Sequence, residues 1–519
     1  MIRRRSFNAG LLAASTLPMP AIAQTTGLSA GKKGGDVIVA MTAAPPTLDA
    51  QATTAQAARN ISMHMYESLF TRDEGANPKP ELAEGVDIAA DGMTYTFKLR
   101  SGVKFHNGKT MTSADAKASM ERYARLGGSA DALKPVAAYE TPDANTLVLK
   151  MGSLFPGLIE AISSPRAPFA IMPAEETAKP VGQPAIIGTG PFRFAEYKPD
   201  NYVKMTRFDG YAANTAYDKR DGFTGRKTAY FDSVTIRIMT EGGARTAALQ
   251  TGEVHVLETL DIPAAKRLKD NKDIRTYNMM PWAFLTLMMN NAWGVTANLE
   301  IRRAIQAALD LEEVAAIASD GLYRLDPAWQ YPGTNYYPGA DGLDAYVRQD
   351  LKKAQARLAA AGYKGEELQI IADSSIKVHL DAATVVAEQL RGAGFKVKLT
   401  ITDWPTVNAS RVKPEGWNLW PLSMGIEPYE GPYNVVGFFA GKAPVQISHD
   451  PVIDDAAAKL GSQLKLEDRR AAVAAFQARM YDQAIAVKVG DTGLVQATRA
   501  NVMNYAPYRI PRMWDCWFA

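Results

Sequence analysis

Short apolar runs alternate with segments of helical periodicity along the chain. The runs are rich in β-branched residues, which favours buried strands, and several helical segments end at a glycine. The predicted strands are residues 36–41, 94–99, 147–150, 192–197, 234–239, 368–372 and 395–401. The predicted helices are residues 53–69, 112–125, 245–250, 301–309, 312–319, 351–361 and 379–391. Strands and helices mixed in this order predict an α/β fold.

Two places in the pattern predict more than a single element. Residues 94–99 (TYTFKL) alternate polar and apolar positions, and the apolar phase resumes at Val103 and Phe105 after a turn at Gly102. This predicts a hairpin with one buried face. Residues 368–401 form a strand, helix, strand series, which predicts part of a mostly parallel sheet.

The first 23 residues differ from the rest of the chain. Three consecutive arginines precede a short apolar run, and residues 21–23 (AIA) have the small-x-small pattern that signal peptidase cleaves. The run is shorter than the roughly 20 residues that span a bilayer. Arg4, Arg5 and Phe7 resemble the twin-arginine signal of proteins exported in the folded state, with an ordinary secretory signal as the alternative. We therefore predict an export signal over residues 1–23 and a periplasmic protein.

The amino-acid composition excludes some classes of binding partner. Of 519 residues, 47% are hydrophobic and 22% charged, which is ordinary globular usage. Without the predicted signal, 55 basic and 55 acidic side chains remain, so no basic surface for nucleic acid is indicated by net charge. No later run reaches 18 apolar residues, which predicts no stable membrane insertion. The single cysteine, Cys516, excludes an internal disulfide, and we expect a monomer.

Eight motifs occur in the order that one protein family shows. They are residues 44–49 (APPTLD), 66–70 (YESLF), 80–84 (PELAE), 91–115 (DGMTYTFKLRSGVKFHNGKTMTSAD), 188–192 (GTGPF), 247–254 (AALQTGEV), 301–310 (IRRAIQAALD) and 354–363 (AQARLAAAGY). Together they resemble the family 5 extracellular solute-binding proteins, which include the oligopeptide-, dipeptide- and nickel-binding proteins of ABC importers. The long run at residues 91–115 is the most specific of the eight.

This resemblance implies a class II periplasmic binding protein-like α/β fold, with two lobes and an inserted subdomain around a ligand cleft. The implied ranges are 36–70, 185–280 and 491–519 for the core of lobe I, 71–184 for its inserted subdomain and 281–490 for lobe II. Lobes of such proteins close over their solute, and the affinity of the solute for the closed state drives that motion. The implied function is a periplasmic receptor that delivers a small solute to an inner-membrane ABC permease.

Candidate ligand-binding residues follow from the resemblance and from side-chain chemistry. A closed cleft needs apolar walls and a few directed polar groups. The tryptophans suit such walls, although each has core packing as its alternative, and Trp282 lies where the chain is expected to cross between the lobes. The candidates are Trp282, Trp404, Trp420, Met424, Glu427, Tyr429 and Tyr433.

The loop at residues 420–433 departs from the peptide binders of the family. Those proteins resemble one another in placing an aspartate there that pairs with the ammonium group of the peptide. The corresponding position in this chain is Met424 or Ser423, depending on the alignment, and neither is charged. A buried ammonium without a counter-charge costs several kcal/mol. The ligand is therefore a peptide only if Glu427 or Glu430 replaces the aspartate; otherwise an aromatic, opine-like or sugar solute is expected.

No catalytic or metal-binding pattern stands out. The five histidines, at positions 64, 106, 255, 379 and 449, form no HExxH motif, and neither GxSxG nor a P-loop is present. We therefore predict no enzyme activity, no cofactor and no metal. Because a fold does not fix a function, an exported hydrolase or a chaperone on the same scaffold remains the alternative.

Overall fold

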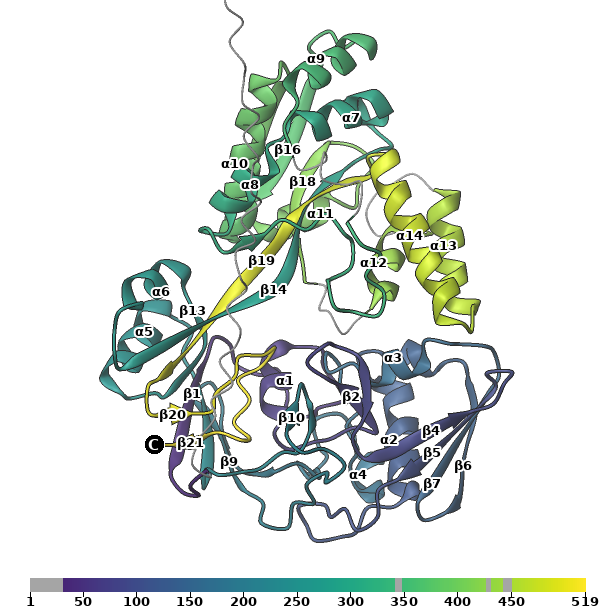
Figure 1. Ribbon diagram of the computed structural model, residues 1–519, viewed down its shortest axis with the longest axis vertical. Coiled ribbons are helices and arrows are strands. Elements are labelled where there is room, and N and C mark those ends of the chain that lie inside the picture. The colour runs from purple at the N-terminus through teal and green to yellow at the C-terminus, as the bar shows by residue number, and fades with distance from the viewer. Residues whose placement is uncertain (1–30, 341–347, 426–430, 442–449) are drawn as a thin grey trace, which may run out of the picture.

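The computed structural model describes residues 31–340, 348–425, 431–441 and 450–519. The predicted export signal and the candidates Glu427 and Tyr429 lie outside these residues. For naming we keep the predicted boundaries, which themselves stay a prediction: the lower lobe is residues 31–280 and 491–519, and the upper lobe is the described part of residues 281–490. Figure 1 shows the two lobes one above the other.

One large sheet runs through both lobes. Its strands, in spatial order, are β17 (Lys396–Thr402), β16 (Glu367–Asp373), β18 (Leu419–Met424), β14 (Ile274–Met289), β19 (Ala486–Arg499), β13 (Val256–Leu260), β1 (Asp36–Met41), β12 (Ser233–Ile238), β9 (Tyr202–Arg207) and β8 (Phe192–Lys198), with β15 (Tyr323–Arg324) paired to β19. The antiparallel strands β14 and β19 run from the lower lobe into the upper one. The lobes are therefore linked by one hydrogen-bonded ribbon.

The core of the lower lobe joins distant parts of the chain. Strand β1 pairs in parallel with β12 and β13, and the residues around them pack against α1 (Gln56–Ser62). On the other side of this sheet lie α5 (Gly242–Thr251) and α6 (Ile262–Leu268). The buried side chains of Trp514 and Cys516 belong to the same cluster as Val37, so the C-terminal segment completes this core.

A second sheet forms one side of the lower lobe. Its order is β4 (Ala83–Ile88), β5 (Thr94–Leu99), β7 (Thr146–Met151) and β6 (Val136–Asp143). Helix α2 (Ser113–Leu126) packs on it, with Tyr123 and Phe97 in the shared core. The shorter elements of the lower lobe are β2 (Phe70–Arg72), β3 (Pro78–Pro80), η1 (Ala130–Leu133), α3 (Leu158–Ile162), α4 (Ala174–Thr177), β10 (Arg220–Asp221), β11 (Thr224–Gly225), β20 (Val502–Met503) and β21 (Trp517–Phe518).

Helices cover both faces of the sheet in the upper lobe. Side chains of β14 alternate between the faces, because Leu285 and Leu287 belong to one core cluster whereas Phe284 and Met288 belong to the other. The first face carries η2 (Gly294–Ala297), α7 (Leu299–Ala308), α8 (Leu311–Ala318), α9 (Leu351–Ala360) and α10 (Lys377–Gly392). The second carries α11 (Trp404–Ser410), α12 (Pro432–Phe439), α13 (Pro451–Ser462) and α14 (Leu466–Asp482).

Most predicted elements are present, and two predictions are wrong. Strand β5 pairs with β4 and β7, whereas Val103 and Phe105 are buried in a loop, so no hairpin spans residues 94–105. The helix predicted for residues 53–69 is only α1, and the chain then turns toward β2. In both places neighbouring segments bury the apolar residues. The spacing of these buried residues therefore resembles the periodicity of a longer strand or helix.

Candidate ligand-binding site

A cavity of about 390 Å³ lies where the two lobes meet beside the linking strands. Its walls come from α6 of the lower lobe, from the linking strands, and from the end of β18 and the start of α10 in the upper lobe. The lining residues are Ile262, Trp282, Ala283, Ala318, Ser319, Asp320, Lys377, Val378, Ser423, Gly425, Thr492 and Gly493. A solute in this cavity would touch both lobes and the ribbon that links them.

Trp282 is the sequence candidate that lines this cavity directly. Its ring is half-buried, and the guanidinium of Arg509 lies 5.0 Å from the ring centroid. Arg509 also donates hydrogen bonds to the carbonyl oxygens of Trp282 (2.9 Å) and Pro281 (2.8 Å). The C-terminal segment of the lower lobe therefore fixes this tryptophan at the lobe boundary.

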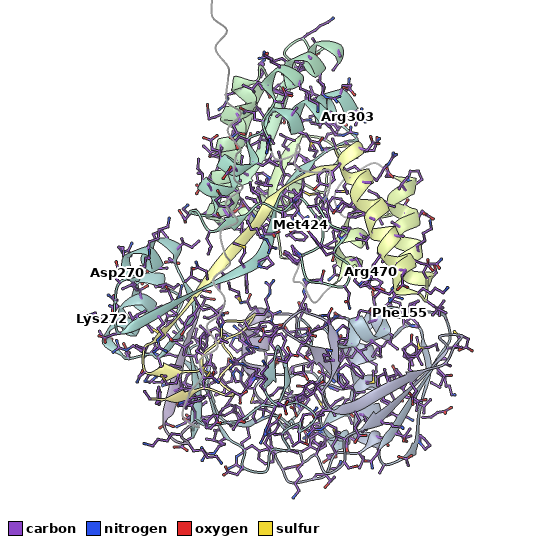
Figure 2. All side chains as sticks on the ribbon, viewed as in Figure 1. Phe155, Asp270, Lys272, Arg303, Met424 and Arg470 are labelled. Atoms are coloured by element: carbon purple, nitrogen blue, oxygen red, sulfur yellow. The ribbon has the colours of Figure 1, made fainter. Side chains whose placement is uncertain are left out.

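The cavity is lined by the neighbours of Met424 rather than by Met424 itself. Figure 2 shows Met424 on the upper lobe, at the side that faces the lower lobe. Its side chain is buried in the second core cluster and pairs with Phe284 across the ladder, while Ser423 and Gly425 face the cavity. Neither position 423 nor position 424 supplies the carboxylate that a peptide ammonium needs.

The charged groups that line the cavity are already paired with each other. The ammonium of Lys377 lies 3.2 Å from a carboxylate oxygen of Asp320 and also pairs with Asp381. The backbone carbonyl of Asp320 accepts a hydrogen bond from Lys266 of α6 (2.8 Å). Two basic side chains from opposite lobes thus meet at Asp320, beside a lining that is otherwise largely apolar.

Sequence reasoning missed Lys377, Asp320 and the other lining residues from α8 and α10. Lys377 follows the carboxyl end of β16, and ligands of open α/β sheets bind at the carboxyl ends of strands. Asp320 follows helix α8 and is not covered by this rule. That rule, applied to the strand predicted at residues 368–372 and its following helix, was the available signal.

Trp404 and Trp420 lie deeper in the upper lobe. Trp420 is fully buried, with its ring centroid 6.3 Å from that of Trp404 and the guanidinium of Arg411 4.9 Å from its centre. Trp404 is half-buried beside His379, at 6.2 Å between ring centroids. Their assignment as ligand contacts stays a prediction.

Tyr433 lies at a second cavity between the lobes, of about 630 Å³. Its ring is 6.4 Å from Phe155 of the lower lobe, and a Cβ placed on Gly157 would meet the phenol at 2.7 Å. Figure 2 shows Phe155 at the side of the lower lobe that faces α14. The candidates Trp282, Met424 and Tyr433 therefore follow the boundary between the lobes from one cavity to the other.

A polar bridge joins the lobes beside Tyr433. The hydroxyl of Tyr336 donates to a carboxylate oxygen of Glu160 (3.2 Å) and accepts from Arg469 (2.9 Å), whose guanidinium lies 3.5 Å from the same carboxylate. Glu160 belongs to α3 of the lower lobe, whereas Tyr336 and Arg469 belong to the upper lobe. The side chains of all three are largely buried, so the bridge has little competition from water.

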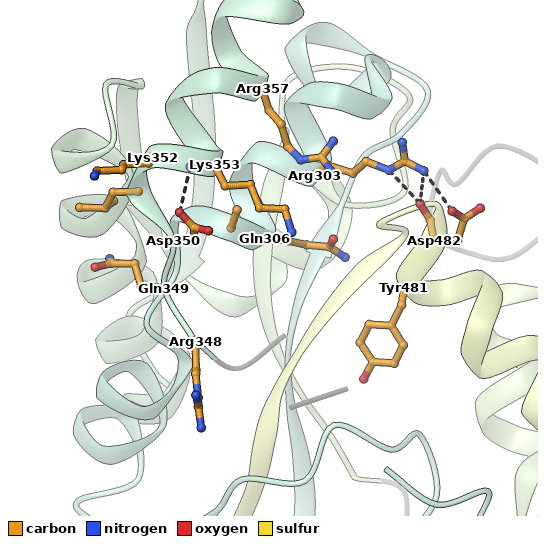
Figure 3. Close-up of a pocket in the computed structure, with 12 residues that line it drawn as sticks. Arg303, Gln306, Arg348, Gln349, Asp350, Lys352, Lys353, Arg357, Tyr481 and Asp482 are labelled. Carbon is orange, nitrogen blue, oxygen red and sulfur yellow. Dashed lines mark hydrogen bonds and ion pairs between the residues drawn. The ribbon is translucent and has the colours of Figure 1, made fainter. Parts of the chain in front are cut away.

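The largest of these cavities, about 1110 Å³, lies within the upper lobe (Figure 3). Arg303 pairs there with Asp482, and Arg348, Lys353 and Gln306 are further lining residues. None of its lining residues comes from the lower lobe. A solute in it would not bridge the lobes, so we do not take it as the candidate site.

No group of three or more histidine, cysteine or acidic side chains within the described ranges is arranged to hold a metal ion. The thiol of Cys516 is buried and free, and burial raises its pKa to about 11. In the same part of the chain, no helix is both long and apolar enough to cross a membrane.

Comparisons with known proteins agree on one family. A model described as bacterial extracellular solute-binding proteins, family 5, matches residues 77–445. A probable peptide ABC transporter periplasmic-binding protein, y4tO, from Sinorhizobium fredii is 25% identical over 99% of this chain and 98% of its own length. The oligopeptide-binding protein AppA of Bacillus subtilis is 27% identical over 76% of this chain and 75% of its own length.

Solved structures show the same fold. The substrate-binding protein CtaP of Listeria monocytogenes matches with a TM-score of 0.81 at 21% identity, covering 94% of this chain and all of that one. The agropinic acid complex of AgaA from A. tumefacien R10 matches with a TM-score of 0.70 at 24% identity, covering 91% and 95%. The predicted fold, of the class II periplasmic binding protein type, is confirmed by these matches.

Proposed function

The chain belongs to family 5 of the bacterial extracellular solute-binding proteins, which bind solutes for ABC importers and are not enzymes, and we propose that its solute binds in the cavity between the lobes at Trp282. Membership of this family removes the alternative of an exported hydrolase. The observation that carries the proposal is a cavity with walls from both lobes and from the ribbon between them. Because such a solute contacts both lobes, its binding favours the closed arrangement.

We further propose that the solute has an apolar or aromatic part and no free ammonium group. Support comes from the lining: Ile262, Ala283, Ala318, Val378 and Trp282 offer apolar surface, and the cationic Lys377 stands beside them. No carboxylate occupies positions 423 or 424. The agropinic acid of the AgaA complex suggests an opine-like compound as the first to test.

The proposal includes the cellular compartment in which the protein acts. The relative from Sinorhizobium fredii is named as a periplasmic-binding protein, and the first 23 residues have the pattern of an export signal. We therefore place the receptor in the periplasm, where it passes its solute to an ABC permease of the inner membrane.

The chemical class is tested by thermal unfolding with matched solutes: agropinic acid, glutathione, the tripeptide Ala-Phe-Ala and its N-acetylated form. A solute at a hundredfold excess over its Kd stabilises the folded protein by about 2.7 kcal/mol, which for lobes of this size raises the Tm by roughly 5 °C. We expect the shift from agropinic acid or from the acetylated peptide and none from Ala-Phe-Ala. A shift given only by solutes with a free amino group contradicts the proposal.

Measuring solute binding to two tryptophan variants of the protein tests where the site lies. Trp282→Ala removes a ring from the cavity wall, and we expect a loss of affinity of roughly tenfold or more. The matched control is Trp293→Ala, since Trp293 is also half-buried but lines a separate cavity within the upper lobe. Equal losses in both variants would place the solute elsewhere.

A further inference from the structure

A buried histidine holds the strand end that lines the ligand cavity. Ser423, near the end of β18, donates its backbone N–H to Nε2 of His379 at 2.8 Å. His379 belongs to the first turn of α10, next to the lining residues Lys377 and Val378. Strand β16 pairs with β18 only at Ile370 and Leu419, so the imidazole takes the place of a strand partner at Ser423.

The other ring nitrogen fixes the form in which this imidazole exists. Nδ1 lies 2.8 Å from a carboxylate oxygen of Asp373, at the end of β16, and Asp373 is fully buried. The second oxygen of Asp373 accepts the backbone N–H of Ile376 (2.8 Å) and the hydroxyl of Ser375 (3.0 Å). A carboxylate can only accept from the ring, so the proton is on Nδ1 and Nε2 is free to accept from Ser423.

We propose that Asp373 and His379 act as a positioning pair for the ligand cavity: at neutral pH they hold Ser423 in the cavity wall, and in acid the wall is released. The inference rests on the proposed function for the meaning of this wall, although the contacts themselves do not depend on it. Protonation of Nε2 would set an N–H against the N–H of Ser423, so the hydrogen bond cannot persist in the imidazolium form.

The surroundings of the ring agree with a group that is neutral at pH 7. Burial lowers the pKa of His379 below its usual value, and the hydrogen bond and charge of Asp373 oppose this only in part. Lys377 of the same helix is paired with Asp320 and Asp381, and the neighbour from α11 is the uncharged ring of Trp404. The release is therefore expected below a pH of about 6.5, the ordinary pKa of histidine.

His255 provides a matched control within the same chain. Its Nδ1 accepts the backbone N–H of Ile38 at 3.0 Å, in the lower lobe and away from the cavity. Burial lowers its pKa as well. Replacing His255 thus removes the same kind of contact without touching the wall at Ser423.

The test is amide hydrogen exchange of the solute-free protein between pH 7.5 and 4.5, resolved to Ser423 and referenced to Leu287 in β14 so that global unfolding is subtracted. In the wild type we expect the protection factor of Ser423 to fall at least tenfold on acidification.

His379→Gln keeps an acceptor that does not titrate, so the protection of its Ser423 amide stays high at both pH 7.5 and pH 4.5. His379→Leu has no acceptor and is unprotected already at pH 7.5. His255→Leu, which has no acceptor for the N–H of Ile38, keeps the wild-type profile at Ser423.

Ring nitrogen NMR of the wild type supplies a second readout, in which we expect the Nδ1–H tautomer of His379 at pH 7.5. Protection of Ser423 that does not change with pH, a wild-type profile in His379→Gln, or an Nε2–H tautomer would each overturn the proposal. No solute enters these measurements, so their outcome is independent of whether the proposed ligand class is right.

Discussion

Each histidine of the described residues accepts a backbone hydrogen bond with one ring nitrogen. The donors are the N–H groups of Met513 to His64 (3.2 Å), Gly188 to His106 (3.2 Å), Ile38 to His255 (3.0 Å) and Ser423 to His379 (2.8 Å). An imidazole accepts a hydrogen bond only through an unprotonated nitrogen. These residues therefore join chain segments as neutral rings.

This arrangement predicts a fold that loses stability in acid. Burial lowers the pKa of His64 to about 4, so the unfolded chain takes up a proton near pH 6.5 that the folded chain does not. The stabilisation is complete above the unfolded pKa and is lost as the pH falls toward 4. For His64 alone the loss at pH 5 is about 2 kcal/mol. Urea unfolding at pH 7 and pH 5 measures it.

The variant His64→Gln isolates this contribution. Its free energy of unfolding is lower at pH 7 than that of the wild type, but its difference between pH 7 and pH 5 should be smaller by about 2 kcal/mol. An unchanged pH dependence in the variant would mean that His64 is already protonated in the folded protein.

Single residues also show what the sequence can and cannot predict. His64 and Trp282 can be singled out in the sequence, but the hydrogen-bond partner of His64 is Met513, 449 residues away. The partner of Trp282 is likewise Arg509, in the C-terminal segment. Chemistry that depends on such pairs follows from the fold and not from local spacing, which is why Lys377 and Asp320 were not among the candidates.

At the scale of elements, the linking strand β19 contains a buried ion pair. Lys488 and Asp491 are both fully buried and lie 3.0 Å apart, and Arg324 of β15 pairs with the same carboxylate at 2.6 Å. The ammonium of Lys488 also lies 4.1 Å from the ring centroid of Phe284 in β14. The partners of Lys488 and Asp491 thus lie within the ribbon and in the neighbouring strand β15.

Removing one member of this pair is expected to be strongly destabilising. Lys488→Met leaves two buried carboxylates, Asp491 and Asp326, with Arg324 as their common cation, and leaving one buried charge uncompensated costs about 3–5 kcal/mol. The double variant Lys488→Met with Asp491→Asn should regain part of that loss, because no buried charge is then left uncompensated. Urea unfolding of the wild type, Lys488→Met, Asp491→Asn and the double variant measures the coupling, and additive losses would contradict it.

The sequence predicts short β-branched runs and amphipathic helices well, and long strands without alternation poorly. The strand predicted at residues 36–41 and the helix predicted at 379–391 match β1 and α10. The two longest strands, β14 and β19, were not predicted, because their upper halves are buried on both faces and show no alternation. At residues 103–105 the opposite occurred, because buried Val103 and Phe105 flank the exposed Lys104 and give the alternation of a strand without forming one.

At the scale of the whole molecule, the bridge of Glu160, Tyr336 and Arg469 is a contact between the lobes that moving them apart would break. Glu160→Gln removes the charge that Arg469 faces, so we expect the solute-free variant to favour the open arrangement. Small-angle X-ray scattering should give it a larger radius of gyration than the wild type.

Glu300→Gln is the control for this measurement. Glu300 pairs with Arg303 and Arg357, but all three residues belong to the upper lobe, so its loss leaves the lobe angle unchanged. Identical scattering from the wild type and Glu160→Gln would show that the bridge does not contribute to closure.

The family and the two-lobed architecture were predictable because motifs such as residues 91–115 and 188–192 resemble those of the family. The boundaries of the lobes and the individual solute contacts stay predictions, and most lining residues escaped sequence reasoning because the cavity draws its walls from α6, β14, β18 and α10, which are far apart in the chain.

The path of the C-terminal segment has a consequence for biosynthesis. Trp514 and Cys516 fill the core around Val37, and β13 finds its neighbour in β19. Nearly the whole polypeptide must therefore be synthesised before β1 has all the residues that pack against it in the core. The last core residue of the upper lobe, Val489, is synthesised before Trp514 and Cys516, so the core of the upper lobe can be completed first.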